Sequence, residues 1–207
     1  MSGYLTVNGR VEKTTVVERS KFICQIKGID NEEQAKEFIA EIKKKHSLAT
    51  HNCYAYIADE KGLIQKFSDD GEPQGTAGFP MLEILRGRKI FKTVAVVTRY
   101  FGGVKLGTGG LVRAYGNAVA DCLDNAEILN LKNAVFYCIN TDYDGYSKLY
   151  KVYSDDVVCV NSVFGEKICV NVAVSEEKVN EFEVKISDVF SGKISFKETG
   201  KGFFPFK

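Results

Sequence analysis

The sequence predicts an α+β protein with two domains, and three observations lead to this class. The chain has 207 residues, more than the roughly 100 to 150 residues of a common domain. Hydrophobic residues make up 44% of it, enough for two buried cores. Short apolar strands and amphipathic helices alternate in both halves, with a polar break near 127–132. We therefore expect domains at residues 1–128 and 132–207.

The first half begins with extended and then helical chain. "TTVVERSKFICQIKGI" predicts extended structure, and Asp30 with Glu33 forms a capping box for the helix that follows. After that helix, "HNCYAYIAD" and "GLIQKFS" predict a hairpin that turns around residues 60–62. The apolar face of the helix consists of Ala35, Phe38, Ile39 and Ile42.

A glycine-rich segment dominates the remainder of the first half. A turn-rich loop, "DDGEPQGTAG", precedes a short helix, "FPMLEILRG", and a buried strand, "KIFKTVAVVTRYF". The segment "GGVKLGTGGL" then leads into a helix that begins near Thr108 or Gly109. The apolar face of this helix consists of Leu111, Val112, Tyr115, Val119, Cys122 and Leu123.

The second half predicts the order strand, helix, strand, strand, helix, strand. "NAVFYCIN" is the first strand, and "DVVCVNSVF" and "EKICVNVAV" form a hairpin that turns at 165–166. Ser175 caps the second helix, and "GKISFKE" closes the domain as a strand. This order is typical of a ferredoxin-like βαββαβ domain over residues 132–200. The helix faces consist of Tyr143, Tyr146, Leu149, Tyr150 and Tyr153, and of Val179, Phe182, Ile186, Val189 and Phe190.

Charge is balanced over the whole chain but not along it. The formal net charge is +1, which excludes a generally basic coat for nucleic acid. Seven cations fall between Arg86 and Arg113 with no acidic residue among them. The six cysteines form no CxxC pair and occur mostly in apolar runs, so we expect reduced core thiols.

The local positive charge coincides with the glycine-rich segment. A strand, a glycine loop and a helix start supply bare amides and a helix dipole, which together can hold an anion such as nucleic-acid phosphate. The alternative is that the glycines only permit a tight corner. Walker and dinucleotide motifs do not fit the spacing. The predicted anion-binding residues are Arg99, Lys105, Gly107, Gly109, Gly110 and Arg113.

An acidic loop precedes this segment in the sequence. Asp69, Asp70 and Glu72 could hold magnesium, could simply build a turn with Gly71 and Pro73, or could pair with the nearby cations. We favour the turn. In any of these cases we expect the acidic loop and the glycine segment to line one bipolar groove.

Other side chains give weaker signals for function. His51 and Cys53 face the same side of a strand, yet no residue in the sequence evidently orients them for nucleophilic catalysis. The tyrosines of the second half suit a core better than stacking on bases. We therefore predict no catalytic residues, no metal and no cofactor. The start "MSGYLTVNGR" does not resemble a signal peptide, and no apolar run could form a membrane helix, so we expect a cytoplasmic protein.

Two motifs resemble a known family. "FSDDGEPQGTAGFPMLEIL" and "VVTRYFGGVKLGTGGLVRAYGNAV" closely resemble the eukaryotic translation regulator IMPACT and its bacterial relatives of the YigZ type. The resemblance covers residues 14–126. The matching positions are Asp69, Asp70, Gly71, Glu72, Pro73, Gly75, Thr76, Ala77 and Gly78 in the first motif. In the second motif they are Arg99, Tyr100, Gly102, Gly103, Lys105, Gly107, Gly109, Gly110, Arg113 and Tyr115.

The resemblance implies folds and a function. The first domain should be like the second domain of a small-subunit ribosomal protein, and the second like the last domain of elongation factor G. A non-enzymatic role in translation or stress follows, with RNA or the ribosome as partner. Eukaryotic IMPACT carries a further N-terminal module that we expect this chain to lack, so kinase regulation is not implied. The alternatives are a phosphate-handling small-molecule enzyme and a protein adaptor that regulates translation without touching nucleic acid; the oligomeric state stays open.

Overall fold

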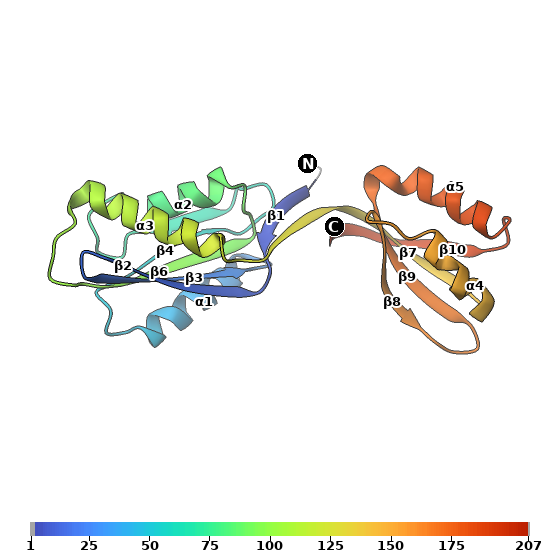
Figure 1. Cartoon of the computed structure of the whole chain (residues 1–207), viewed down its shortest axis with the longest axis horizontal. Helices are drawn as coiled ribbons and strands as arrows, with labels where there is room; N and C mark the ends of the chain where they lie inside the picture. Colours follow the sequence, from blue (N-terminus) through green and yellow to red (C-terminus); the bar gives the residue numbers. More distant parts are fainter. Residues whose placement is uncertain (1–2, 207) are drawn as a thin grey trace. The chain divides into compact units, whose positions relative to one another are not determined.

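The computed structural model describes residues 3–206, which divide into two compact units (Figure 1). Residues 4–129 form the first unit, and residue 3 with residues 130–206 forms the second. Each contains an antiparallel β-sheet with helices packed on it. The predicted α+β class with two domains is therefore confirmed.

The first unit is built on a sheet with the strand order β2-β3-β6-β4-β5. All neighbouring strands in it are antiparallel. Its central strand, β6, is buried at every position except the last, as expected for a strand with helices on both faces. The strands are β2 (Arg10–Val17), β3 (Ser20–Gly28), β4 (His51–Ile57), β5 (Gln65–Ser68) and β6 (Thr93–Tyr100).

Helices cover both faces of this sheet, so the unit has three layers (Figure 1). Helix α1 (Glu32–Lys45) packs on one face, where Phe38 and Ile42 meet Val94 and Val96. Helices α2 (Gly78–Gly87) and α3 (Gly107–Leu123) pack on the other. The larger core lies beneath α2 and α3 and includes Phe22, Ile26, Ala55, Met81, Leu85, Val97, Tyr115 and Val119.

Several predicted details of the first unit are wrong. Strand β1 (Gly3–Val7) was not expected. The helix cap is Asn31, one residue after Asp30, because the Asn31 side chain accepts the Gln34 N–H at 3.0 Å. Helix α3 begins at Gly107, and Val112 is 40% exposed. The other five residues of the predicted face are buried as expected: Leu111, Tyr115, Val119, Cys122 and Leu123.

The second unit has the predicted order of elements. Its strands lie in the order β10-β7-β9-β8. Helices α4 and α5 pack on one face of the sheet, over Ile139, Val170 and Val172, and Phe182 of α5 is in that core. The elements are β7 (Ile128–Thr141), α4 (Tyr143–Lys148), η1 (Leu149–Lys151), β8 (Val157–Val163), β9 (Ile168–Ser175), η2 (Glu176–Lys178), α5 (Val179–Val189) and β10 (Ser195–Pro205).

The predicted first helix of this unit is longer than the observed one. The observed helix α4 ends at Lys148 and is followed by the 3₁₀ turn η1, so the tyrosines of the predicted helix do not share one face. Tyr143 and Tyr150 are exposed, while Leu149 is fully buried. Ser175 makes no side-chain cap, since a 3₁₀ turn separates it from α5. Within residues 3–206, no helix is long and apolar enough to span a membrane.

Candidate functional site

The acidic loop is held together by Asp69. One carboxylate oxygen accepts the Gly75 N–H at 2.8 Å, and the other accepts the N–H groups of Ala77 and Gly78 at 3.0 and 2.8 Å. The Thr76 hydroxyl closes the same turn by donating to the Pro73 carbonyl at 2.6 Å. Asp69 therefore builds the loop and the start of α2.

Asp70 ties the loop to its neighbours. Its carboxylate pairs with Lys43 Nζ at 2.6 Å and accepts the Asn52 N–H at 2.6 Å. The Asp70 carbonyl lies 2.9 Å from His51 Nδ1. Protein donors thus occupy the carboxylates of Asp69 and Asp70. In the described part of the chain, no three His, Cys, Asp or Glu side chains cluster as metal ligands would.

Glu72 joins the acidic loop to the glycine segment. Its side chain is 3% exposed. One of its oxygens accepts from Arg99 at 2.7 Å and from the Tyr115 hydroxyl at 2.8 Å. Burial, with Cys53 and Glu72 nearby, raises the pKa of Tyr115 well above its usual value. The sequence left three possible roles for the acidic residues: a magnesium site, a turn, or pairing with nearby cations. Glu72 has the third role, since it pairs with Arg99.

Arg99, one of the predicted anion-binding residues, is an internal residue. It is 5% exposed, and its guanidinium lies 5.5 Å from the Phe22 ring centre and 5.4 Å from that of Phe101. It also donates to the Ser20 hydroxyl at 3.3 Å. Glu72 and Ser20 thus engage two nitrogens of the guanidinium, while Nε is buried without a hydrogen-bond partner in the described structure.

His51 and Cys53 do not form a reactive dyad. Cys53 is fully buried, and its thiol contacts the Asp69 carbonyl at 3.0 Å. Burial raises the pKa of this thiol to about 12, so it is protonated near neutral pH. The His51 ring is directed to the acidic loop, with Nε2 3.8 Å from a Glu72 carboxylate oxygen.

The remaining predicted cations border an open groove next to α3. Lys105, Gly110 and Arg113 line it, together with residues 15–18 at the end of β2. Its volume is about 680 Å³, and Glu18 and Asp121 also border it. We call this feature the α3 groove. Helix α3 starts beside it with no side-chain cap at Leu106 and no acidic residue in the first turn.

The glycines of the segment serve different purposes. A Cβ on Gly102 would lie 2.1 Å from the Arg19 carbonyl group, so packing excludes any side chain there. Gly107 has a φ of +69°, which suits glycine where the chain turns into the helix. Apart from its own chain neighbours and the backbone of its own helix, no described atom lies within 4 Å of the position that a Cβ on Gly109 would take. Packing thus explains Gly102 and leaves Gly109 unexplained.

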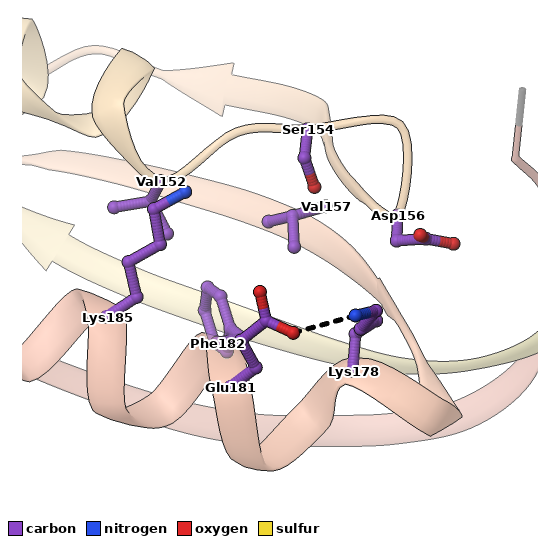
Figure 2. A pocket seen from close by; sticks show the side chains of 8 residues that line it. All are labelled: Val152, Ser154, Asp156, Val157, Lys178, Glu181, Phe182 and Lys185. Carbon is purple, nitrogen blue, oxygen red and sulfur yellow. Dashed lines mark hydrogen bonds and ion pairs between the residues drawn. The ribbon is translucent and has the colours of Figure 1, made fainter.

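A smaller cavity in the second unit was not foreseen from the sequence (Figure 2). It has a volume of about 180 Å³ and lies between α5 and the chain before β8. Lys178 and Glu181, three residues apart on the helix side of the cavity, pair at 2.8 Å. Its lining residues are Val152, Ser154, Asp156, Val157, Lys178, Glu181, Phe182 and Lys185. Two cations and two anions line the cavity.

These features define a two-domain α+β protein in which a buried acid–base pair joins two sequence motifs beside an open groove with charges of both signs. The model of the Impact N-terminal domain matches residues 18–123. The chain is 40% identical over 199 residues to the IMPACT family member YvyE of Bacillus subtilis, covering 96% of this chain and 92% of that protein. It therefore belongs to the IMPACT family, among its bacterial members of the YigZ type.

Further comparisons agree with this assignment. The IMPACT family member YigZ of Escherichia coli is 34% identical over 197 residues, which is 94% of this chain and 97% of that one. A crystal structure described as that of a hypothetical protein is 33% identical and superposes with a TM-score of 0.63 over 95% of this chain and 97% of its own. Protein IMPACT of Mus musculus is 34% identical over 94 residues, 43% of this chain and 29% of that protein.

Proposed function

We propose that this protein is a non-enzymatic, cytoplasmic regulator of translation or stress that binds RNA or the ribosome through the α3 groove. The observation that carries the proposal is that Lys105, Gly110 and Arg113 line this groove where α3 begins without a side-chain cap. Gly109, next to Gly110, adds support, because no contact in the described structure requires a glycine there. A ligand that approaches the main chain closely explains its presence.

The chemistry around Gly109 suits a phosphate. The first N–H groups of α3 have no partner within the helix, and the helix dipole is positive at this end. Lys105 and Arg113 are exposed on the groove and add two full charges. Contacts of this kind recognise the phosphate backbone and predict weak base preference.

The folds of both units support this proposal by analogy. The second unit has the element order and the strand order, β10-β7-β9-β8, of a ferredoxin-like domain, and we liken it to the last domain of elongation factor G. We liken the first unit to the second domain of a small-subunit ribosomal protein. The relatives called IMPACT point the same way, since the family resemblance implies a role in translation.

The test compares two double variants of the full chain. Lys105→Gln with Arg113→Gln removes both groove cations. The matched control is Lys36→Gln with Lys44→Gln, which removes two exposed cations from α1 on the opposite face of the sheet. Filter binding of single-stranded RNA and of purified ribosomes is measured over several salt concentrations, with thermal melts to check folding.

We expect only the groove variant to lose affinity. Its log–log salt dependence should flatten by about one unit for each phosphate that the variant no longer binds. Equal affinities and equal slopes for the two variants would contradict the proposal. Binding to ribosomal proteins without any salt dependence would favour the protein-adaptor alternative instead.

A further inference from the structure

Two cysteine side chains of the second unit meet on the face of the sheet that the helices leave open. Cys138 is in β7 and Cys169 is in β9, and their sulfur atoms are 2.6 Å apart. Residues next to them in sequence, Tyr137 and Val170, belong to the core on the helix side. Because side chains alternate along a strand, both thiols project from the opposite face.

The backbone register explains why the thiols meet. Cys138 pairs with Asn171 across the ladder, and Cys169 pairs with Asn140. The two cysteines are thus diagonal neighbours on one face, within reach of side chains that lean toward each other. A disulfide bond needs a sulfur separation of about 2.05 Å, so the observed thiols have to move only a few tenths of an ångström.

Solvent can reach this pair. Cys138 and Cys169 are half-buried, whereas Cys24, Cys53 and Cys122 are fully buried in the first unit. The expectation that the cysteines are core thiols therefore fails for these two and for Cys159. Cys159 in β8 is also half-buried, but its thiol contacts Asn161 and Ser162.

We propose that Cys138 and Cys169 form a reversible oxidation site at which a hydroperoxide converts the two thiols into an intramolecular disulfide. A thiolate attacks the peroxide, the O–O bond breaks, and a sulfenic acid and an alcohol or water form. The second thiol attacks the sulfenic sulfur, the S–O bond breaks, and water leaves as the S–S bond forms. Two thiols are oxidised, and the peroxide is reduced by two electrons.

Either thiol can start the reaction. Both sulfur atoms can serve as donor or acceptor in their contact, so either cysteine can attack the peroxide while the other resolves the sulfenic acid. The hydrogen bond to Cys169, followed by burial, raises the pKa of Cys138 to about 11. Because the thiolate is the nucleophile, the reaction should become faster as pH rises.

The experiment treats the full-length protein with a small molar excess of hydrogen peroxide and then alkylates the remaining thiols under denaturing conditions. Intact mass and peptide mapping follow. We expect the loss of two alkylation sites out of six and of the mass of two hydrogens. A linked peptide pair should contain Cys138 and Cys169, and dithiothreitol should restore both sites. The thermal midpoint of the second unit should rise by at least about 10 °C on oxidation.

Variants make the test specific. Cys138→Ser and Cys169→Ser should abolish the linked peptide pair, and the matched control Cys159→Ser should leave it unchanged. If a serine variant fails to fold, peptide mapping of the unaltered protein still shows whether Cys138 and Cys169 are linked. Retention of all alkylation sites, a disulfide between two molecules, or sulfinic acid on one cysteine without a link would each overturn the proposal.

Discussion

At Glu72 a single carboxylate oxygen accepts hydrogen bonds from Arg99 and Tyr115, two residues of a different motif. The acid and the base are 27 positions apart in the sequence and almost fully buried. Removing one charge of such a pair leaves the other buried without a counter-ion, which costs far more than losing a surface ion pair. The pair therefore fixes the acidic loop against the strand that leads to the glycine segment.

Arg99→Met tests this role. We expect the free energy of unfolding to fall by about 3–5 kcal/mol, because the Glu72 carboxylate stays buried without its cation. Urea denaturation measures the loss. The double variant Glu72→Met with Arg99→Met should recover a substantial part of it, since no charge is then left unpaired. Additive losses in the two single variants and the double variant would show that the residues are not coupled.

Gly109→Ala separates fold from binding at one residue. The helix should be as stable as before or more stable by up to about 1 kcal/mol, because alanine favours helix and the site has room for a Cβ. RNA affinity should fall severalfold if a phosphate touches this backbone. Gly87→Ala, at the end of α2 with equally open surroundings, is the matched control. Loss of stability at Gly109 without loss of affinity would contradict the assignment.

At the scale of elements, the C-terminal end of α1 is fastened by His46. Its Nδ1 lies 3.0 Å from the Tyr100 hydroxyl of β6, and its Nε2 lies 3.3 Å from the Gln25 amide nitrogen of β3. The Gln25 amide oxygen accepts from Arg10, so the amide nitrogen faces His46 as a donor. Nε2 is therefore the acceptor, which requires the neutral imidazole, because a protonated ring has no acceptor nitrogen.

The stability of the protein should consequently depend on pH through His46. Burial, and next the charge of Lys45, lowers the pKa of His46 in the folded state. The unfolded state then binds the proton more readily. The contribution of His46 to the free energy of unfolding is therefore fully present above the ordinary pKa of about 6.5, and it is lost as pH falls toward the lower pKa of the folded state. Chemical denaturation between pH 8 and 5 measures this loss. His46→Gln should reduce the slope, and an unchanged slope would exclude His46 as its source.

Periodicity predicted the elements better than it predicted their ends. Ala35, Phe38, Ile39 and Ile42 are buried as expected because their spacing alone specifies one face of α1. Asn31 rather than Asp30 caps that helix because both residue types suit a cap and only the chain geometry decides.

The candidate site was predicted in part, for a physical reason. Lys105, Gly110 and Arg113 do line one groove, since they are close in sequence around a helix start. Arg99 belongs to the same cationic run, yet it is buried by Phe22 and Glu72, which approach from other parts of the chain. The meeting of Cys138 and Cys169 likewise depends on the register between β7 and β9. Neither contact leaves a local sequence signal.

At the scale of the whole molecule, two hydrophobic cores predict two unfolding events. The larger core of the first unit and the core around Ile139 in the second share no residue. We expect scanning calorimetry to resolve two transitions. Arg99→Met should lower only one of them, and Ile139→Val, at a cost of about 1 kcal/mol, only the other. Equal shifts of both transitions would show that the units unfold together.

The central place of β6 also governs how the chain takes shape during its synthesis. Strands β3 and β4 pair with β6 and not with each other, and β6 begins only at Thr93. A nascent chain that has just emerged as far as α2 therefore consists of two separate hairpins with open edges, and isolated hairpins are barely stable in water. The sheet of the first unit therefore cannot form until the whole of β6, up to Tyr100, has left the ribosome, and its strand edges stay exposed until then. A translational pause before the codon for Tyr100 would lengthen the time in which aggregation competes with folding.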